Sequence, residues 1–269
     1  MSAGRDLRAQ LRHGMVVAPL VYDALTALIA QRAAFEACAV SIDGTAAQLG
    51  VDPHLLNLTD AADNVRYVAD AVSIPVIAEA PHAVRDARQV AHCVAELEAA
   101  GAAAVYFDGL PDHVRAALDA RIDPAFVVIA RTRLHDADDW SRVLERVHAL
   151  RRADADLVYV DGLDGGTVLD YCARHVAHHG PTACGGSMST TLTSALGFAL
   201  HFAGAGHALS MAAVRDALAR LRRGDEPNRR DRLDFDELTS LLGLDEVYAL
   251  EARYAAPAPT DSTKARRRP

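Results

Sequence analysis

The chain has 269 residues, of which 51% are hydrophobic, and this is enough to bury one large core of the size found in single α/β barrels. Its formal net charge of −8 provides no basic surface of the kind that follows a phosphate backbone, so a nucleic-acid partner is not expected. No segment approaches the roughly 18 uninterrupted apolar residues of a membrane span, and the N-terminus has the pattern of a charged amphipathic helix rather than of a signal peptide. We therefore expect a cytoplasmic protein without a membrane partner.

The cysteines and the C-terminal tail carry two further expectations. Cys38, Cys93, Cys172 and Cys184 are scattered, with no C-x-x-C pair, which favours reduced thiols in a cytosolic protein. Residues 255–269 are rich in Pro and Ala and end in basic residues, a composition that buries too little apolar surface to fold. We expect a single domain over residues 1–254 and a disordered tail over 255–269.

Short apolar runs alternate with helical patterns along the whole chain. Strands are predicted at 15–19, 37–41, 75–80, 103–108, 126–131, 157–161, 182–184 and 198–202. Helices are predicted at 22–32, 60–71, 84–100, 111–120, 140–152, 167–178, 190–197 and 208–222. Eight strands, each followed by a helix, predict an α/β fold of the (β/α)8 TIM-barrel class, and no G-x-G-x-x-G follows the first strand to favour a Rossmann fold.

The segment "LDFDELTSLLGLDEVYALEARY" predicts additional C-terminal helices beyond the eighth unit. Asp234 and Glu237 have the spacing of a capping box. The apolar positions of these helices must be covered, either by the underside of the barrel or by a neighbouring subunit.

In a barrel of this class the active site lies at the carboxyl ends of the strands. The residues that the sequence places there are Ser41, Asp43, Glu79, Asp108, Arg131, Arg133, Asp161 and Cys184. Several carboxylates with one or two arginines suit a divalent cation together with a carboxylate-bearing substrate. Any single one of these acids is more readily explained as the cap of the following helix, but four acids, each at the end of its own strand, favour a site; Cys184 is explained as a small buried residue.

Six segments, in order, resemble the isocitrate lyase/phosphoenolpyruvate mutase superfamily over about residues 7–254. They are "PLVYDALTALIA", "SIPVIAEA", "AELEAAGAAAVYFD", "DPAFVVIARTR", "ADLVYVDG" and "FDELTSLLGLDEVYALEARY". The resemblance implies a (β/α)8 barrel that binds Mg²⁺ (or Mn²⁺) and a 2-oxo acid or its enolate. It also implies a homo-oligomer, a dimer or more typically a tetramer, formed by exchange of a C-terminal helix.

The metal motif of the superfamily is altered in this chain. The family pattern P-V-I-A-D-A-D-T-G places a metal-binding Asp where Glu79 stands, and its second Asp is replaced by Pro81, with His82 and Ala83 in place of Thr-Gly. In the I-E-D strand the Glu matches Asp108. The resemblance thus assigns the metal to Glu79 and Asp108, while the altered motif leaves open that no metal is bound.

Other positions of the pattern are kept or exchanged. The Arg of I-A-R-T-D is retained as Arg131 and its Asp is Arg133, whereas the Glu of F-V-E-G is Asp161. The S-G-x-G turn reads "SIDG", which keeps Ser41 and Gly44 and introduces Asp43; these three and Arg131 are the predicted substrate-binding residues.

The long mobile loop of the lyase branch, with its K-[KR]-C-G-H motif, is missing. After Asp108 the sequence "DGLPDHVRAALDARIDP" runs almost directly into the next helix and contains no Cys. Without that acid and that lid, ordinary isocitrate or methylisocitrate cleavage is not expected.

Three residues are predicted to be catalytic. Arg131 would hold a substrate carboxylate in a bidentate fork, His82 would transfer a proton near neutral pH, and Asp161 completes the set. The alternatives are a structural salt bridge for Arg131 and an ordinary exposed loop position for His82. The sequence thus predicts a diverged enzyme that cleaves or decarboxylates a small 2-oxo or 2-hydroxy carboxylate through an enolate-like state, and it leaves open whether the bond broken is C–C or C–P. The alternative is a catalytically inactive barrel that serves as a ligand-binding or assembly subunit.

Overall fold

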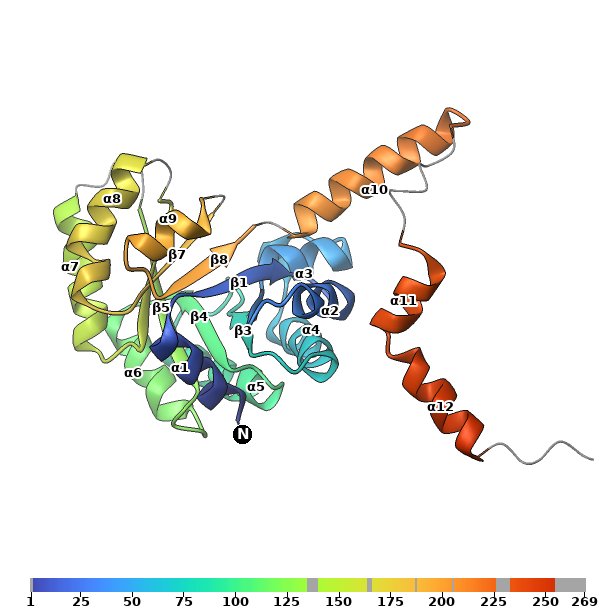
Figure 1. Cartoon of the computed structure of the whole chain (residues 1–269). Helices are drawn as coiled ribbons and strands as arrows, with labels where there is room; N and C mark the ends of the chain where they lie inside the picture. The colour runs from blue at the N-terminus through green and yellow to red at the C-terminus, as the bar shows by residue number, and fades with distance from the viewer. Residues whose placement is uncertain are drawn as a thin grey trace, which may run out of the picture.

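The computed structural model describes residues 2–134, 140–163, 166–186, 188–204, 206–225 and 233–254. Eight parallel strands form a closed barrel in the order of the sequence, β1 to β8, and β8 pairs with β1 to close it (Figure 1). The strands are β1 (Val16–Val21), β2 (Cys38–Val40), β3 (Val76–Glu79), β4 (Ala104–Asp108), β5 (Val127–Arg133), β6 (Leu157–Asp161), β7 (Thr182–Gly186) and β8 (Leu200–Ala203). The predicted (β/α)8 fold is confirmed, and all eight predicted strands overlap an observed one.

Helices precede, connect and follow the strands. They are α1 (Ala3–His13), α2 (Ala24–Arg32), α3 (Ile42–Leu49), α4 (Leu58–Ala71), α5 (Ala87–Ala99), α6 (Pro111–Ala120), α7 (Trp140–Arg152), α8 (Gly166–His175), α9 (Thr190–Ala195), α10 (Gly206–Arg222), α11 (Phe235–Leu241) and α12 (Leu244–Tyr254). Short 3₁₀ turns occur at Pro53–Leu55 and Ala177–His179. Among these described helices, none combines the length and the apolarity needed to cross a bilayer.

Two layers of apolar side chains hold the fold together. One lies between the strands and the surrounding helices and includes Val65, Val94, Val128 and Val147, all essentially without solvent exposure. The other fills the barrel itself, where alternate residues of each strand point inward. Helix α1 packs with this inner layer through Leu7, and Arg8 binds the carbonyl oxygens of Ala125 and Phe126 at 2.8 and 3.2 Å.

Helix α3 is the main element that the sequence did not predict. It follows β2 directly, and Ser41 is its N-cap because the Ser41 hydroxyl accepts the N–H of Gly44 at 3.1 Å. The segment "SIDG" reads as a turn, but in the fold it is the first turn of this helix. Strand β5 also runs two residues further than predicted, so that both Arg131 and Arg133 lie within it.

The C-terminal helices leave the barrel surface. Figure 1 shows α10 projecting from the end of β8, with α11 and α12 beside the barrel rather than beneath it. Helix α11 reaches the barrel through a 2.7 Å hydrogen bond from Arg32 of α2 to the Ser240 hydroxyl. Asp234 caps α11 by accepting the N–H of Glu237 at 2.7 Å, as its spacing predicts. The predicted tail, residues 255–269, lies outside the described residues.

Candidate active site

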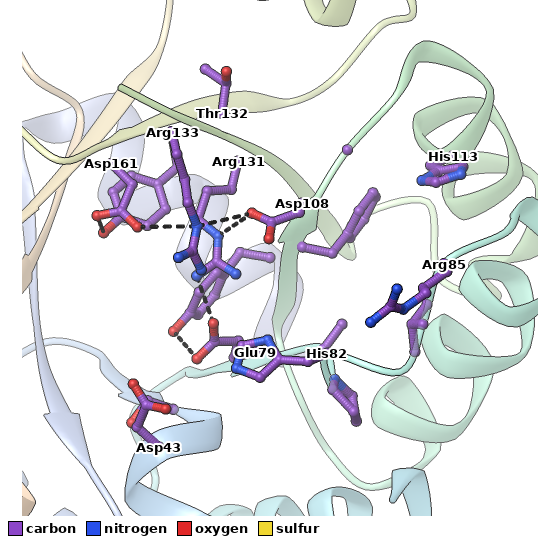
Figure 2. A pocket seen from close by; sticks show the side chains of 18 of the residues that line it. Asp43, Glu79, His82, Arg85, Asp108, His113, Arg131, Thr132, Arg133 and Asp161 are labelled. Carbon is purple, nitrogen blue, oxygen red and sulfur yellow. Dashed lines mark hydrogen bonds and ion pairs between the residues drawn. The ribbon is translucent and has the colours of Figure 1, made fainter. Parts of the chain in front are cut away.

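A cavity of about 1110 Å³ opens at the carboxyl ends of the strands. Side chains alternate along a strand, so the inward positions of β3 to β6 place a row of charged groups at this end. These groups are Glu79, Asp108, Arg131, Arg133 and Asp161. Figure 2 shows the two guanidinium groups in the centre, with Asp161 and Asp108 on either side and Glu79 below. The structure brings these five side chains together at one cavity, as the sequence analysis expected.

Arg131 lies between two carboxylates. Its Nη1 is 2.6 Å from Glu79 Oε1 and its Nε is 2.6 Å from Asp108 Oδ1. Register explains the second contact, because Asp108 and Arg131 are direct partners of the β4–β5 pair. Only 6% of the Arg131 side chain and 7% of the Glu79 side chain are exposed, whereas 57% of Asp108 is. This is the ion pair that the sequence left open as an alternative to a substrate clamp.

The other oxygen of Glu79 is also engaged. Glu79 Oε2 accepts the backbone N–H of Ile42 at 3.0 Å and the hydroxyl of Tyr106 at 3.0 Å. Ile42 begins α3, so the carboxylate lies at the positive end of that helix. Glu79 is therefore fixed by three donors from three different elements, α3, β4 and β5.

Arg133 makes looser contacts further out in the cavity. Its Nε lies 3.6 Å from Asp108 Oδ1 and 3.8 Å from Asp161 Oδ2. Asp161 accepts the Tyr159 hydroxyl at 3.1 Å and the N–H of Gly162 at 2.9 Å. Four charges thus alternate in sign from Glu79 to Arg131 to Asp108 to Arg133, and Asp161 extends the series.

The ion pairs move the pKa values of their members. Burial opposes ionisation of Asp108, but the hydrogen bond and the charge of Arg131, with smaller contributions from Arg133 and His82, lower its pKa below the ordinary 3.8. Burial likewise works against the charge of Arg131, yet Glu79 and Asp108 raise the pKa of its guanidinium above the ordinary value. Burial and the neighbouring Glu79 raise the pKa of the Tyr106 hydroxyl, so it stays a neutral donor. The site holds a permanent guanidinium cation.

The remaining predicted residues lie around this cluster. Ser41 and Asp43 line the cavity; Ser41 is buried as the α3 cap, whereas Asp43 is exposed and lies apart from the ion pairs, as Figure 2 shows. A Cβ on Gly44 would meet Ser41 Oγ and Tyr22 Cβ at 3.0 Å each, so this glycine serves close packing. His82 is half-buried, lines the cavity and has its ring centroid 5.1 Å from that of His54.

A cluster of three aromatic rings lies at the inner end of the cavity, which Tyr106 and Tyr159 line, and the sequence reasoning missed it. Tyr106, Tyr159 and Phe202 contact one another with ring centroids 4.9 to 6.0 Å apart, and the Arg131 guanidinium lies 5.4 Å above the ring of Tyr106. A signal was present, because Tyr106 and Tyr159 each precede a strand-end Asp by two residues and so share its inward face.

Comparison with known proteins places this site in a family. The family model described as phosphoenolpyruvate phosphomutase matches residues 7–222. The chain belongs to this family. The 2,3-dimethylmalate lyase of Eubacterium barkeri is 26% identical over 90% of this chain and 94% of its own. The oxaloacetate decarboxylase of a Bradyrhizobium species is 32% identical over 82% of this chain and 85% of its own. The superfamily resemblance seen in the sequence is thereby confirmed.

A solved structure bears on the contents of such sites. Phosphonopyruvate hydrolase in complex with oxalate and Mg²⁺ is 25% identical and superposes with a TM-score of 0.84, covering 95% of this chain and 100% of its own. That structure therefore contains a magnesium ion and oxalate, a two-carbon dicarboxylate.

The residues present here do not suit a divalent cation as they are arranged. Mg²⁺ takes six oxygen ligands at ~2.1 Å, some of them from carboxylates. Both oxygens of Glu79 and one oxygen of Asp108 already bind N–H or O–H donors, and the side chain of Pro81 has no ligand atom. Within the described residues, no three His, Cys, Asp or Glu side chains are grouped so that they could hold a metal ion.

Proposed function

We propose that the protein is a lyase that breaks a carbon–carbon bond of a small 2-oxo or 2-hydroxy carboxylate, by cleavage or by decarboxylation. The similarity to a 2,3-dimethylmalate lyase and an oxaloacetate decarboxylase supports the reaction class. The observation that carries the proposal is Arg131, a guanidinium only 6% exposed on the floor of a cavity large enough for such a substrate.

The chemistry needs fixed positive charge at one point. In a 2-oxo acid the bond that breaks lies one carbon beyond the carbonyl carbon, its electron pair passes into an enolate, and negative charge collects on the former carbonyl oxygen. In a 2-hydroxy acid the C2–C3 bond breaks, the hydroxyl gives up its proton as C2 becomes a carbonyl carbon, and the electron pair passes into the enolate of the departing carboxylate fragment. Preorganised donors at the oxygen that gains the negative charge lower the barrier because they require no reorganisation during the reaction. Arg131 is held by Glu79 and Asp108, so its orientation is fixed before the substrate arrives.

The relatives supply the choice of substrate to try. The names 2,3-dimethylmalate lyase and oxaloacetate decarboxylase both denote enzymes of four-carbon-chain dicarboxylates with oxygen at C2. In this chain Arg131 would hold the carboxylate and the C2 oxygen, and Ser41, Asp43 and Gly44 would bound the site on the α3 side. We infer the same substrate class for this protein.

His82 and Asp161 are the proposed proton-transfer groups. His82 lines the cavity beside Asp108 and can deliver a proton to the enolate carbon after the bond has broken. Asp161 faces the same cavity from β6, with Tyr159 and Gly162 donating to it. A magnesium or manganese ion on Glu79 and Asp108 stays a prediction from the sequence, and no step here depends on it.

The experiment is a turnover assay on oxaloacetate and 2,3-dimethylmalate with the wild type and two variants. The wild type is expected to release the products of decarboxylation or cleavage, and Arg131→Lys, which loses the fork, is expected to lower kcat/KM by about 100-fold or more. Arg115→Lys is the matched control, because Arg115 is exposed on α6 and, among the residues that the structure describes, forms its ion pair with Asp112. No turnover of either acid, together with no binding of oxalate, would instead support the inactive ligand-binding or assembly subunit.

We also propose that the protein is a homo-oligomer, a dimer or a tetramer. Large apolar side chains are exposed along the C-terminal helices, including Leu218 of α10, Phe235 of α11 and Leu250 of α12. Helices with such faces are normally covered, and a second copy of the chain supplies a matching face.

A further inference from the structure

The guanidinium of Arg131 occupies the place between Glu79 and Asp108 that a cation bridging the two acids would need. Its two contacts, from Nη1 to Glu79 and from Nε to Asp108, are both 2.6 Å long. Such short charge-assisted hydrogen bonds are among the strongest that side chains make. A divalent ion in this place would have to displace the Arg131 guanidinium.

The surroundings hold Arg131 in this position. Glu79 cannot turn away, because Ile42 N–H and the Tyr106 hydroxyl bind its other oxygen. The ring of Tyr106 lies under the guanidinium at 5.4 Å. Displacing Arg131 would therefore break its ion pairs with β3 and β4 and its contact with the Tyr106 ring, while Glu79 stayed fixed by α3.

A second guanidinium weakens the field that would attract a metal ion. Arg133 Nε lies 3.6 Å from Asp108 and 3.8 Å from Asp161, so its positive charge partly neutralises both carboxylates. A metal cation bound by these carboxylates would lie close to the positive guanidinium of Arg133, and like charges repel strongly in a partly buried site. The cluster is therefore built around organic cations.

Some N–H groups of Arg131 remain available to a substrate. Of its five N–H groups, one on Nε and one on Nη1 bind the acids, and within the described residues those on Nη2 make no hydrogen bond. Arg131 also lines the cavity. A substrate oxygen can thus bind the guanidinium without disturbing either ion pair.

We infer that this site works without a divalent cation, because the Arg131 guanidinium supplies the positive charge that stabilises the substrate oxyanion. The inference rests on the proposed function and specifies its electrophile. The electron pair of the broken bond goes to the enolate, the enolate oxygen binds Arg131, and the guanidinium keeps all its protons. For a 2-oxo acid that loses CO₂, only the proton that later reaches the carbon must be supplied, and His82 is the proposed donor. For a 2-hydroxy acid the hydroxyl proton must first be removed, and Asp161 is the proposed base.

Calorimetric titration with oxalate separates this inference from the proposed function. The probe is titrated into the full-length wild type in chelator-treated buffer and then in buffer with excess Mg²⁺ or Mn²⁺. We expect the two Kd values to agree within about twofold. Binding that appears only with metal, or that metal tightens by about tenfold or more, overturns the inference and leaves the proposed function standing. No binding in either buffer overturns both.

Electron paramagnetic resonance of Mn²⁺ measures metal binding directly and does not depend on turnover. The signal of free Mn²⁺ is expected to keep its intensity when wild-type protein is added, because Glu79 and Asp108 are already paired with Arg131. A saturable loss of this signal with one ion per chain would overturn the inference. Arg131→Met frees Glu79 and Asp108. It is expected to weaken metal-free oxalate binding by about tenfold or more, whereas the exposed control Arg115→Met keeps it unchanged. Should Arg131→Met not fold, the two wild-type measurements still decide.

Discussion

Arg131 illustrates how one buried side chain acquires both a structural and a chemical role. A buried ion pair adds little net stability over an apolar pair, since desolvation offsets the attraction, but removing one partner leaves the other charged and unpaired. Glu79 has 7% of its side chain exposed and would be left with only Ile42 N–H and Tyr106 as donors.

Loss of Arg131 should therefore be costly for the fold. We expect Arg131→Met to lower the free energy of unfolding by about 3–5 kcal/mol, as measured by urea denaturation followed by circular dichroism. The exposed pair of Arg115 with Asp112 sets the control, where Arg115→Met should cost no more than about 1 kcal/mol. Equal effects of the two substitutions would show that burial does not distinguish the pairs.

Asp108 predicts a pH dependence of stability with a definite sign. Its folded-state pKa is lowered below the ordinary 3.8, mainly by Arg131 acting against the effect of burial. A lowered pKa means that the ionised form is favoured by folding, so the contribution is present above 3.8 and is lost as the pH falls through the folded-state pKa. Because Asp108 is half exposed, the effect is modest.

The measurement compares wild type with Asp108→Asn between pH 7 and the acid limit of the fold. The stability difference between them is expected to be constant from pH 7 to 5 and to shrink below about pH 4. A difference that stays constant down to the acid limit would show that Asp108 has an unshifted pKa.

The convergence of the charged residues could be predicted from the sequence, but their partners could not. Glu79, Asp108, Arg131 and Asp161 end apolar runs, and strand ends meet in any parallel barrel, so their meeting follows from periodicity alone. Whether Glu79 faces a metal or a guanidinium depends on the register of β4 and β5 and on where α3 begins. The runs of apolar residues in the sequence reveal neither the β4–β5 register nor the first residue of α3.

At the scale of elements, the parallel strands were readable because both of their faces are buried. Such strands appear as continuous runs such as "AFVVIA" and "LVYV", and turn residues bound them. Helix α3 was missed because its first turn contains Asp43 and Gly44, which have poor helix propensity. The Ser41 cap and the packing of Ile42 and Ala46 against Leu56 and Ala61 override that preference.

Helix α1 offers a test at this scale. Gly4 lies inside it, and a Cβ there would lie 2.7 Å from the Ala125 carbonyl oxygen and 2.9 Å from the Phe126 nitrogen. These are backbone atoms that cannot move aside. The helix would have to lift, which would withdraw the fully buried Leu7 from the barrel and strain the Arg8 hydrogen bonds.

We therefore expect Gly4→Ala to lower the free energy of unfolding by about 1–3 kcal/mol, although alanine in an open helix would raise it. Gly14→Ala is the control, because no atom lies within 4 Å of a Cβ at the end of the same helix. It should change stability by less than about 0.5 kcal/mol in the same urea titration. A stabilising Gly4→Ala would mean that α1 does not pack this closely.

At the scale of the whole molecule, the closed barrel shields every thiol. The four cysteines are free and buried, and burial raises the pKa of each to about 12. Thiolates are the reactive species, so a disulfide reagent at pH 8 should label none of the four in the native protein and all four after denaturation. Rapid labelling of one native thiol, Cys184 in particular, would indicate a reactive thiolate and support a role for that cysteine as a nucleophile.

The C-terminal helices raise the question of what covers them. On α10, Met211, Val214, Leu218 and Leu221 follow one another at helical spacing and are 41–60% exposed, forming one apolar stripe. An uncovered stripe of this length is unfavourable in water, and α11 and α12 continue the exposed apolar surface with Phe235, Val247 and Leu250.

We expect light scattering after gel filtration to give a mass of two or four chains of 28.7 kDa. Leu218→Glu places a charge in the stripe and should shift the mass to that of one chain, because an unpaired carboxylate would be buried in the interface. Ala213 is exposed on another side of α10, so Ala213→Glu adds the same charge outside the stripe and should leave the assembly intact. Because the barrel is closed within one chain, oxalate binding should survive in the Leu218→Glu monomer. A wild-type mass of one chain, or an assembly that Leu218→Glu leaves intact, would mean that this stripe is not the subunit interface.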